Sequence, residues 1–164
     1  MMGIGGGTLL YFITAYSVDG LYATQEEFDR AAASMGSNAA YIAMAGPARA
    51  LNTLGGQTAW QTTAFGAIVA GLMSMFLIGR HTRVEEETGR DELVRSSAVG
   101  RHAPATAAVL LAVLANLALG LLVAASLGGY GLAAADSLAL GLGVAACGWV
   151  FAGTALAAMQ LAST

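Results

Sequence analysis

The sequence predicts an all-α transmembrane helical bundle, and three observations support this prediction. Of its 164 residues, 57% are hydrophobic and only 10% are charged, whereas a soluble domain is about a quarter charged. The apolar residues form long blocks instead of alternating with polar ones, as they do in membrane helices. Five of the seven arginines lie in one short connector, and the chain has no lysine. We therefore expect a multi-pass protein of the cell membrane, embedded in the lipid bilayer.

Four blocks have the composition of spanning helices, and we place these spans at 2–18, 59–79, 103–127 and 137–162. The last three contain no charged residue, and at about 1.5 Å per residue each exceeds the roughly 30 Å hydrocarbon core. The first block is shorter, and its three consecutive glycines each lower helix propensity by about 1 kcal/mol. A signal peptide is the alternative for this block, but the basic segment that begins such a peptide is missing.

The distribution of arginine predicts how the bundle is oriented. The 80–102 connector contains five arginines, the longer 19–58 connector contains Arg30 and Arg49, and the 128–136 connector contains none. Short connectors that are rich in arginine stay on the cytoplasmic side. We therefore expect 80–102 and both termini to be cytoplasmic, and 19–58 to form an extracytoplasmic loop.

The extracytoplasmic loop is expected to begin with a short helix. Thr24 is followed three residues later by Glu27, which is the spacing of a capping box at a helix start. Two turn signals follow, Gly-Pro at 46–47 and Gly-Gly at 55–56.

The cytoplasmic connector is expected to form a helix at about 82–97. Thr82 and Glu85 again have capping-box spacing, and the acids at 85–87 suit a first helical turn because the helix dipole favours negative charge there. Gly89 interrupts the segment, so two short helices are as compatible with it as one. The connector could be only a solvated hairpin that fixes topology, but its mixed charges, with Leu93 among them, favour a docking surface.

Few polar groups lie inside the spans. Asn116 is the one amide deep in a block; a hydrogen bond to a neighbouring helix is the simpler interpretation, and a place on a translocation path is the other. Thr154 and Gln160 carry the same two interpretations. Small residues at 141, 145 and 148 predict close helix packing.

Several function classes are disfavoured by residues that are missing. The last three blocks contain no ionisable group other than the cysteine Cys147, which disfavours ion-coupled transport and an intramembrane enzyme. The sequence lacks a phosphate-binding loop and a basic face for nucleic acid. A metal site is not expected either, because His81 and Glu85 would need His102 from the far end of the connector.

The connector also resembles a known family. The run EEETGRDELVRSSAVGRHAPATAAVLLA after the second span resembles the membrane subunits of type-2 ABC exporters. GPARALNTLGGQTAW and VFAGTALAAMQL are similar to the actinobacterial permeases linked to export of tetronasin-type polyketide antibiotics. Such permeases are built from six-helix units, so the resemblance implies a portion of a longer permease, which would pair with further helices or a second permease half.

The resemblance implies that 80–102 couples this chain to separate ATPase subunits, in two copies, which hold the ATP and Mg²⁺; no cofactor is expected in this chain. Residues that match the coupling region and its exit are Glu85, Glu86, Glu87, Gly89, Arg90, Glu92, Leu93, Arg95, Gly100 and Arg101. The implied function is ATP-driven efflux of hydrophobic or amphipathic drugs and antibiotics. A four-helix membrane adaptor that recruits a cytoplasmic partner through 80–102, without transport, is the alternative.

Overall fold

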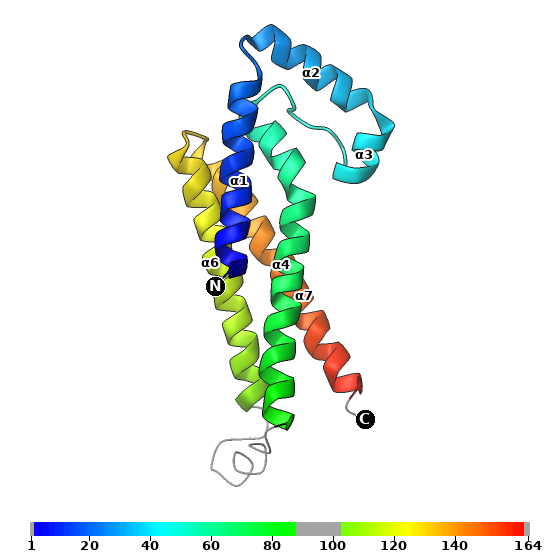
Figure 1. The fold of residues 1–164 in the computed structure, drawn as a ribbon, viewed down its shortest axis with the longest axis vertical. Helices are drawn as coiled ribbons and strands as arrows, with labels where there is room; N and C mark the ends of the chain where they lie inside the picture. Colours follow the sequence, from blue (N-terminus) through cyan, green and yellow to red (C-terminus); the bar gives the residue numbers. More distant parts are fainter. Residues whose placement is uncertain (1, 88–102, 163–164) are drawn as a thin grey trace.

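A computed structural model describes residues 2–87 and 103–162 of the chain. Within these residues it contains helices and no strand, which confirms the expected all-α class. Three long helices and the shorter α1 form an elongated bundle, and α2 and α3 form an arm at one end of it (Figure 1). The helices are α1 (Met2–Leu21), α2 (Gln25–Ser37), α3 (Ala39–Ala45), α4 (Leu54–Glu87), α6 (Ala103–Gly129) and α7 (Ala134–Ala162).

Three helices in the described part of the chain are long and apolar enough to cross a membrane: Leu54–Arg80 in α4, Ala105–Gly129 in α6 and Ala134–Leu161 in α7. They correspond to the last three expected spans, so the structure supports three of the four. The first block does form a helix, but α1 is not among the three. Its glycines and Asp19 explain this, because they dilute the apolar content of a helix of only 20 residues.

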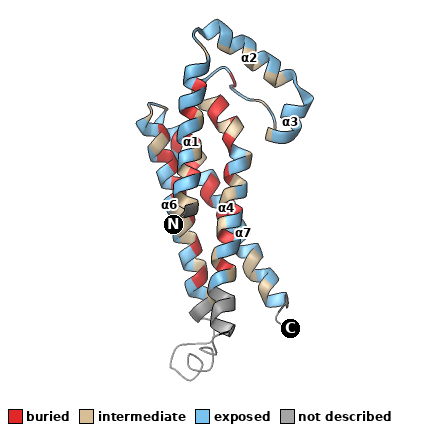
Figure 2. Ribbon diagram, in the orientation of Figure 1, coloured by how far each residue is buried: buried red, intermediate tan, exposed pale blue. Residues whose placement is uncertain are grey.

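The bundle is organised around α4 and α6. α1 contacts both of these helices, α7 also contacts both, and α4 and α6 contact each other. Two clusters of buried side chains hold this arrangement together. One includes Tyr11 of α1 with Leu119 of α6 and Val144 of α7. The other lies farther from the arm and contains Ile78 and Ala112 but no residue of α1. In Figure 2 the buried residues follow the inner faces of these helices.

The arm confirms the expected capping at Thr24. Its side chain accepts a hydrogen bond from the backbone N–H of Glu27 at the start of α2, and the Glu27 carboxylate accepts one from Ala23. Asn38 caps α3 in the same way, and Gly46 ends α3 with a φ of 86°, as the Gly-Pro turn signal predicted. Neither α2 nor α3 contains a buried residue.

The second turn signal is wrong, because Gly55 and Gly56 lie in the first turn of α4. The Thr53 hydroxyl accepts a hydrogen bond from the Gly56 backbone N–H and so satisfies one of the exposed donors that begin a helix. A Cβ on Gly56 would collide with the backbone carbonyl of Ala50. Glycine is needed here for close approach and not for a turn.

The expected start of a cytoplasmic helix at Thr82 is also wrong. α4 continues without a break from Leu54 through Glu87, so Thr82 lies inside a helix and cannot cap one, since an N-cap residue has extended backbone. No proline interrupts this stretch. Whether a second helical piece extends to 97 is a question about residues outside the described part.

Candidate functional site

The described spans have a polar centre at Asn116, which is fully buried. Its amide donates hydrogen bonds to the Ser74 hydroxyl of α4 and to the Ala112 carbonyl of its own helix, both at 2.8 Å. Ser74 is also fully buried and donates to the Ala70 carbonyl at 2.7 Å. The simpler interpretation of Asn116, a hydrogen bond to a neighbouring helix, is what the structure shows.

Gly148 of α7 completes this polar centre. A Cβ at Gly148 would collide with the Asn116 side-chain oxygen, so one Cα–H of the glycine points at that oxygen. The oxygen is buried and accepts no hydrogen bond from the described residues, and a Cα–H donor gives it a weak contact. Asn116 therefore ties together α4, α6 and α7 at one level of the bundle.

The small-residue stripe on α7 packs as expected. A Cβ on Gly141 would collide with the backbone carbonyl of Gly120 on α6, and the reverse also holds. Ala145 is fully buried in the same contact. A second polar contact joins these helices, since the Trp149 indole donates to the Val113 carbonyl at 3.2 Å.

Thr154 and Gln160 do not join Asn116. Both are exposed on α7, and the Thr154 hydroxyl donates to the Phe151 carbonyl of its own helix at 3.0 Å. Asn116 is buried inside the bundle, whereas Thr154 and Gln160 are exposed on the surface of this chain.

The coupling residues are only partly placed. Glu85, Glu86 and Glu87 form the last turn of α4. The other matched positions, Gly89, Arg90, Glu92, Leu93, Arg95, Gly100 and Arg101, lie outside the described residues, as do the Glu86–Arg90 and Asp91–Arg95 pairs that the spacing suggested. The described part of the connector, residues 80–87, thus continues the membrane-crossing part of α4 directly.

Two polar contacts lie at the end of the bundle that carries the arm. The Tyr130 hydroxyl in the α6–α7 turn donates to the Asp19 carboxylate of α1 at 2.9 Å. Burial and this carboxylate raise the pKa of Tyr130 above its ordinary value of 10.0. The amide of Gln57, a residue only 1% exposed, donates to the Tyr22 hydroxyl at 3.2 Å and so links α4 to the start of the arm.

The sequence analysis missed two of the residues in these polar contacts, Ser74 and Gln57. Ser74 gave no signal because a serine inside an apolar block is common, and only the register of α4 against α6 places it beside Asn116. Gln57 was missed because the Gly-Gly pair before it was interpreted as a turn. An amide three residues before a tryptophan, at the edge of a span, was the available signal.

The chain is similar to a known permease. It is 37% identical over 145 residues to the multidrug efflux system permease protein Rv1217c of Mycobacterium tuberculosis. The match covers 88% of this chain but 26% of that permease, so the chain spans about a quarter of its relative's length. No protein-family model matches the chain. No solved structure matches it either.

Proposed function

We propose that this chain is part of the membrane-spanning permease of an ABC exporter, which moves hydrophobic or amphipathic compounds out of the cell. The observation that carries this proposal is the 37% identity to a multidrug efflux permease across nearly the whole chain. The three apolar helices and the charged connector between α4 and α6 agree with it. We include α1 as a fourth span, because it packs along α4 and α6.

The connector is the part that we propose contacts the ATPase. Five arginines and five acids lie within 80–102, and the ten residues matched above would form the docking surface. Two ATPase subunits would bind ATP and Mg²⁺ and hydrolyse the nucleotide, while this chain contributes helices. The remaining translocation path would come from further permease helices.

The continuity of α4 suggests how work would reach the spans. α4 extends through Glu87 without a kink-forming proline, and its 34 residues give a rod of about 51 Å. Motion of the connector would therefore move α4 as one body. Ser74 on this helix is bonded to Asn116 of α6, so α6 would follow, and the bundle would rock between two arrangements.

The absence of charge along the described spans indicates the substrate class. Between Leu54 and Ile78 and throughout α6, no ionised side chain is present to bind a charged solute. Burying a charge without a partner is costly. We therefore propose hydrophobic or amphipathic substrates, and the polyketide antibiotics named by the sequence resemblance are the first compounds to test.

Charge reversal in the connector tests this function. Glu85, Glu86 and Glu87 are replaced together by lysine in the protein expressed from its complete gene. We expect about tenfold less ATPase to co-purify, corresponding to a loss of about 1.4 kcal/mol of binding free energy, together with loss of drug export from cells. The control reverses Glu26 and Asp29, which are exposed on α2 at the opposite end.

Normal ATPase association and normal export in the connector variant would reject the coupling role. A protein that binds a cytoplasmic partner through this loop but never exports any compound would instead be the adaptor.

A further inference from the structure

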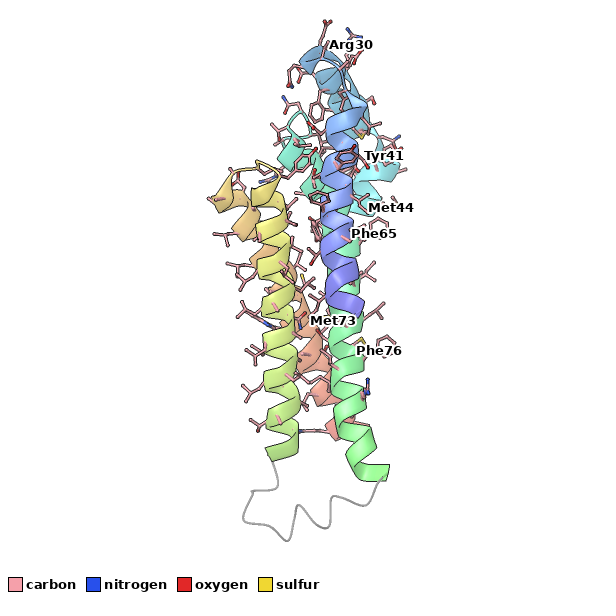
Figure 3. All side chains as sticks on the ribbon, turned by 60° about the vertical axis from the view of Figure 1, so that its left-hand side comes forward. Arg30, Tyr41, Met44, Phe65, Met73 and Phe76 are labelled. Atoms are coloured by element: carbon pink, nitrogen blue, oxygen red, sulfur yellow. The ribbon has the colours of Figure 1, made fainter. Side chains whose placement is uncertain are left out.

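A cavity of about 560 Å³ lies between α1, α3 and α4, away from the polar centre at Asn116. Its walls include side chains from the arm and from the half of α4 nearest the arm, among them Tyr41, Met44, Trp60, Gln61, Phe65 and Ile68. Figure 3 shows Tyr41, Met44 and Phe65 near one another at the end of the bundle that carries the arm. A space of this size matches the pockets that hold drug-sized molecules, which measure about 300–1,000 Å³.

The cavity is aromatic and uncharged. Among the described residues that line it, none is Asp, Glu, Lys, Arg or His. The rings of Tyr41 and Trp60 meet edge to face with centroids 6.1 Å apart. The Trp60 indole is held in place because it donates to the Gly46 carbonyl at 3.0 Å. Beside these fixed rings, Met35 and Met44 provide flexible side chains that adapt to different shapes.

Two polar groups in the walls give the cavity an amphipathic character. The Gln61 amide and the Tyr41 hydroxyl belong to lining residues, and among the hydrogen bonds of the described residues neither has a partner. The Thr14 hydroxyl, by contrast, is satisfied by the Leu10 carbonyl of its own helix. A few placed polar groups in an otherwise apolar pocket are typical of small-molecule sites, where they fix the orientation of the ligand.

The cavity opens to the outside of the bundle. Met44 is 67% exposed and Phe65 is 56% exposed, although both are apolar. Trp60 and Phe65 lie in the first half of the membrane-crossing part of α4, counted from Leu54, and Ile68 lies near its middle. With the connector on the cytoplasmic side, this is the depth of the outer leaflet.

We propose that this cavity binds one neutral, amphipathic small molecule at the outer leaflet, as the site from which an exported compound is released. The assignment of release rests on the proposed export function; the assignment of the ligand class rests on the lining. α3 forms one wall of the space. The unpaired amide and hydroxyl favour a compound with a polar group over an acyl chain.

Photolabelling tests the site directly. The complete permease with its ATPase is placed in phosphatidylcholine nanodiscs and irradiated with a neutral steroid that carries a diazirine. We expect saturable labelling of peptides that contain Tyr41, Met44 and Phe65, with competition by excess progesterone. Ala64 lines the cavity, so Ala64→Trp fills the space and should lower labelling at least about tenfold.

Two further variants keep the test decisive. Leu72→Trp adds the same ring to an exposed position of α4 outside the cavity and should label like the wild type. Met44→Ala changes an exposed wall residue without touching the core. We expect this variant to be labelled less than the wild type, and misfolding would not explain such a reduction.

Labelling that does not saturate, that is equal in Ala64→Trp, or that appears only with a diazirine-bearing phosphatidylcholine would overturn the site. If labelling fails while export continues, the site is wrong and the exporter stands. If export never occurs but labelling is saturable, the cavity binds small molecules and the release role falls with the proposed function.

Discussion

At the scale of single residues, the contact between Asn116 and Ser74 matters most, because it is buried at the centre of the spans. Hydrogen bonds between membrane helices contribute about 0.6 kcal/mol on average and at most about 1.7 kcal/mol. The two residues nevertheless fix the register of α4 on α6, since one step along either helix would separate them. The two residues therefore contribute mainly to the specificity with which α4 packs on α6.

A double-mutant cycle measures this contact. Asn116→Leu and Ser74→Ala should each destabilise the protein, and the double variant should be more stable than the sum of the two losses by about 0.6–1.7 kcal/mol. Unfolding by SDS titration in mixed micelles provides the free energies. The control pair of Asn116→Leu with Thr154→Ala, whose hydroxyl bonds only within α7, should be additive. Additivity in both pairs would show that the Asn116–Ser74 bond does not form.

Two glycines on α7 give a matched comparison. Gly148→Ala forces a methyl group into the Asn116 side chain and should cost about 1–3 kcal/mol of stability. Gly143→Ala meets nothing within 4 Å and should leave stability unchanged or slightly raised. The same SDS titration distinguishes them. Equal effects of the two substitutions would contradict the close packing of α6 on α7.

The sequence identified Asn116 as an unusual buried amide and predicted close packing at the small-residue stripe of α7, but it predicted no partner for either. A single amide in an apolar block stands out by composition alone. Its partner is determined by how two helices align, and neither helix contains that information by itself. For the same reason Thr154 and Gln160 were grouped with Asn116, although they face the other way.

At the scale of elements, polar contacts near the arm hold α1 and the arm to the bundle. The Tyr130–Asp19 bond joins the end of α1 to the α6–α7 turn, and the rings of Phe12 and Tyr130 meet edge to face at 5.8 Å beside it. α2 and α3 have no buried residue of their own. They depend on a few bonds such as Gln57–Tyr22.

The Tyr130–Asp19 bond should depend on pH. Because the pKa of Tyr130 is raised in the folded protein, the phenol stays protonated and donates. The stability from this bond is complete below the ordinary value of 10.0 and is lost as the pH rises through the higher folded-state pKa. Phenolate absorbance of the wild type minus Tyr130→Phe should show a titration above 10.0, and Asp19→Asn should shift it downward. A difference titration at or below 10.0 would contradict the contact.

Element existence was predictable here, whereas element boundaries were not. The uncharged blocks located three helices, yet each helix in the structure extends beyond its block: α4 begins at Leu54 and continues to Glu87. The signals that predicted boundaries, Gly55-Gly56 and Thr82, were overridden. At the Gly-Gly pair, Gly56 packs closely against the carbonyl of Ala50. At Thr82 the helix continues, because adding a residue to a helix costs little once the preceding turn has formed.

At the scale of the whole molecule, the bundle has two distinct ends. One end carries the arm and the neutral cavity, and the other carries the continuation of α4 and the charged connector. Under the proposed function, this separation would give the chain a direction, from energy input at the connector to release at the arm. The direction follows from the arginine distribution, and the described structure agrees in placing the arm and α4's charged end far apart (Figure 1).

Cysteine labelling tests the central claim that the chain crosses the membrane with its connector inside. In a Cys147→Ala background, Thr88→Cys follows the last residue of α4, and Ser34→Cys lies exposed on α2. A membrane-impermeant maleimide added to intact cells should label Ser34→Cys and should reach Thr88→Cys only after permeabilisation. Labelling of Thr88→Cys from the outside of intact cells would contradict the orientation, and with it the coupling role and the release site.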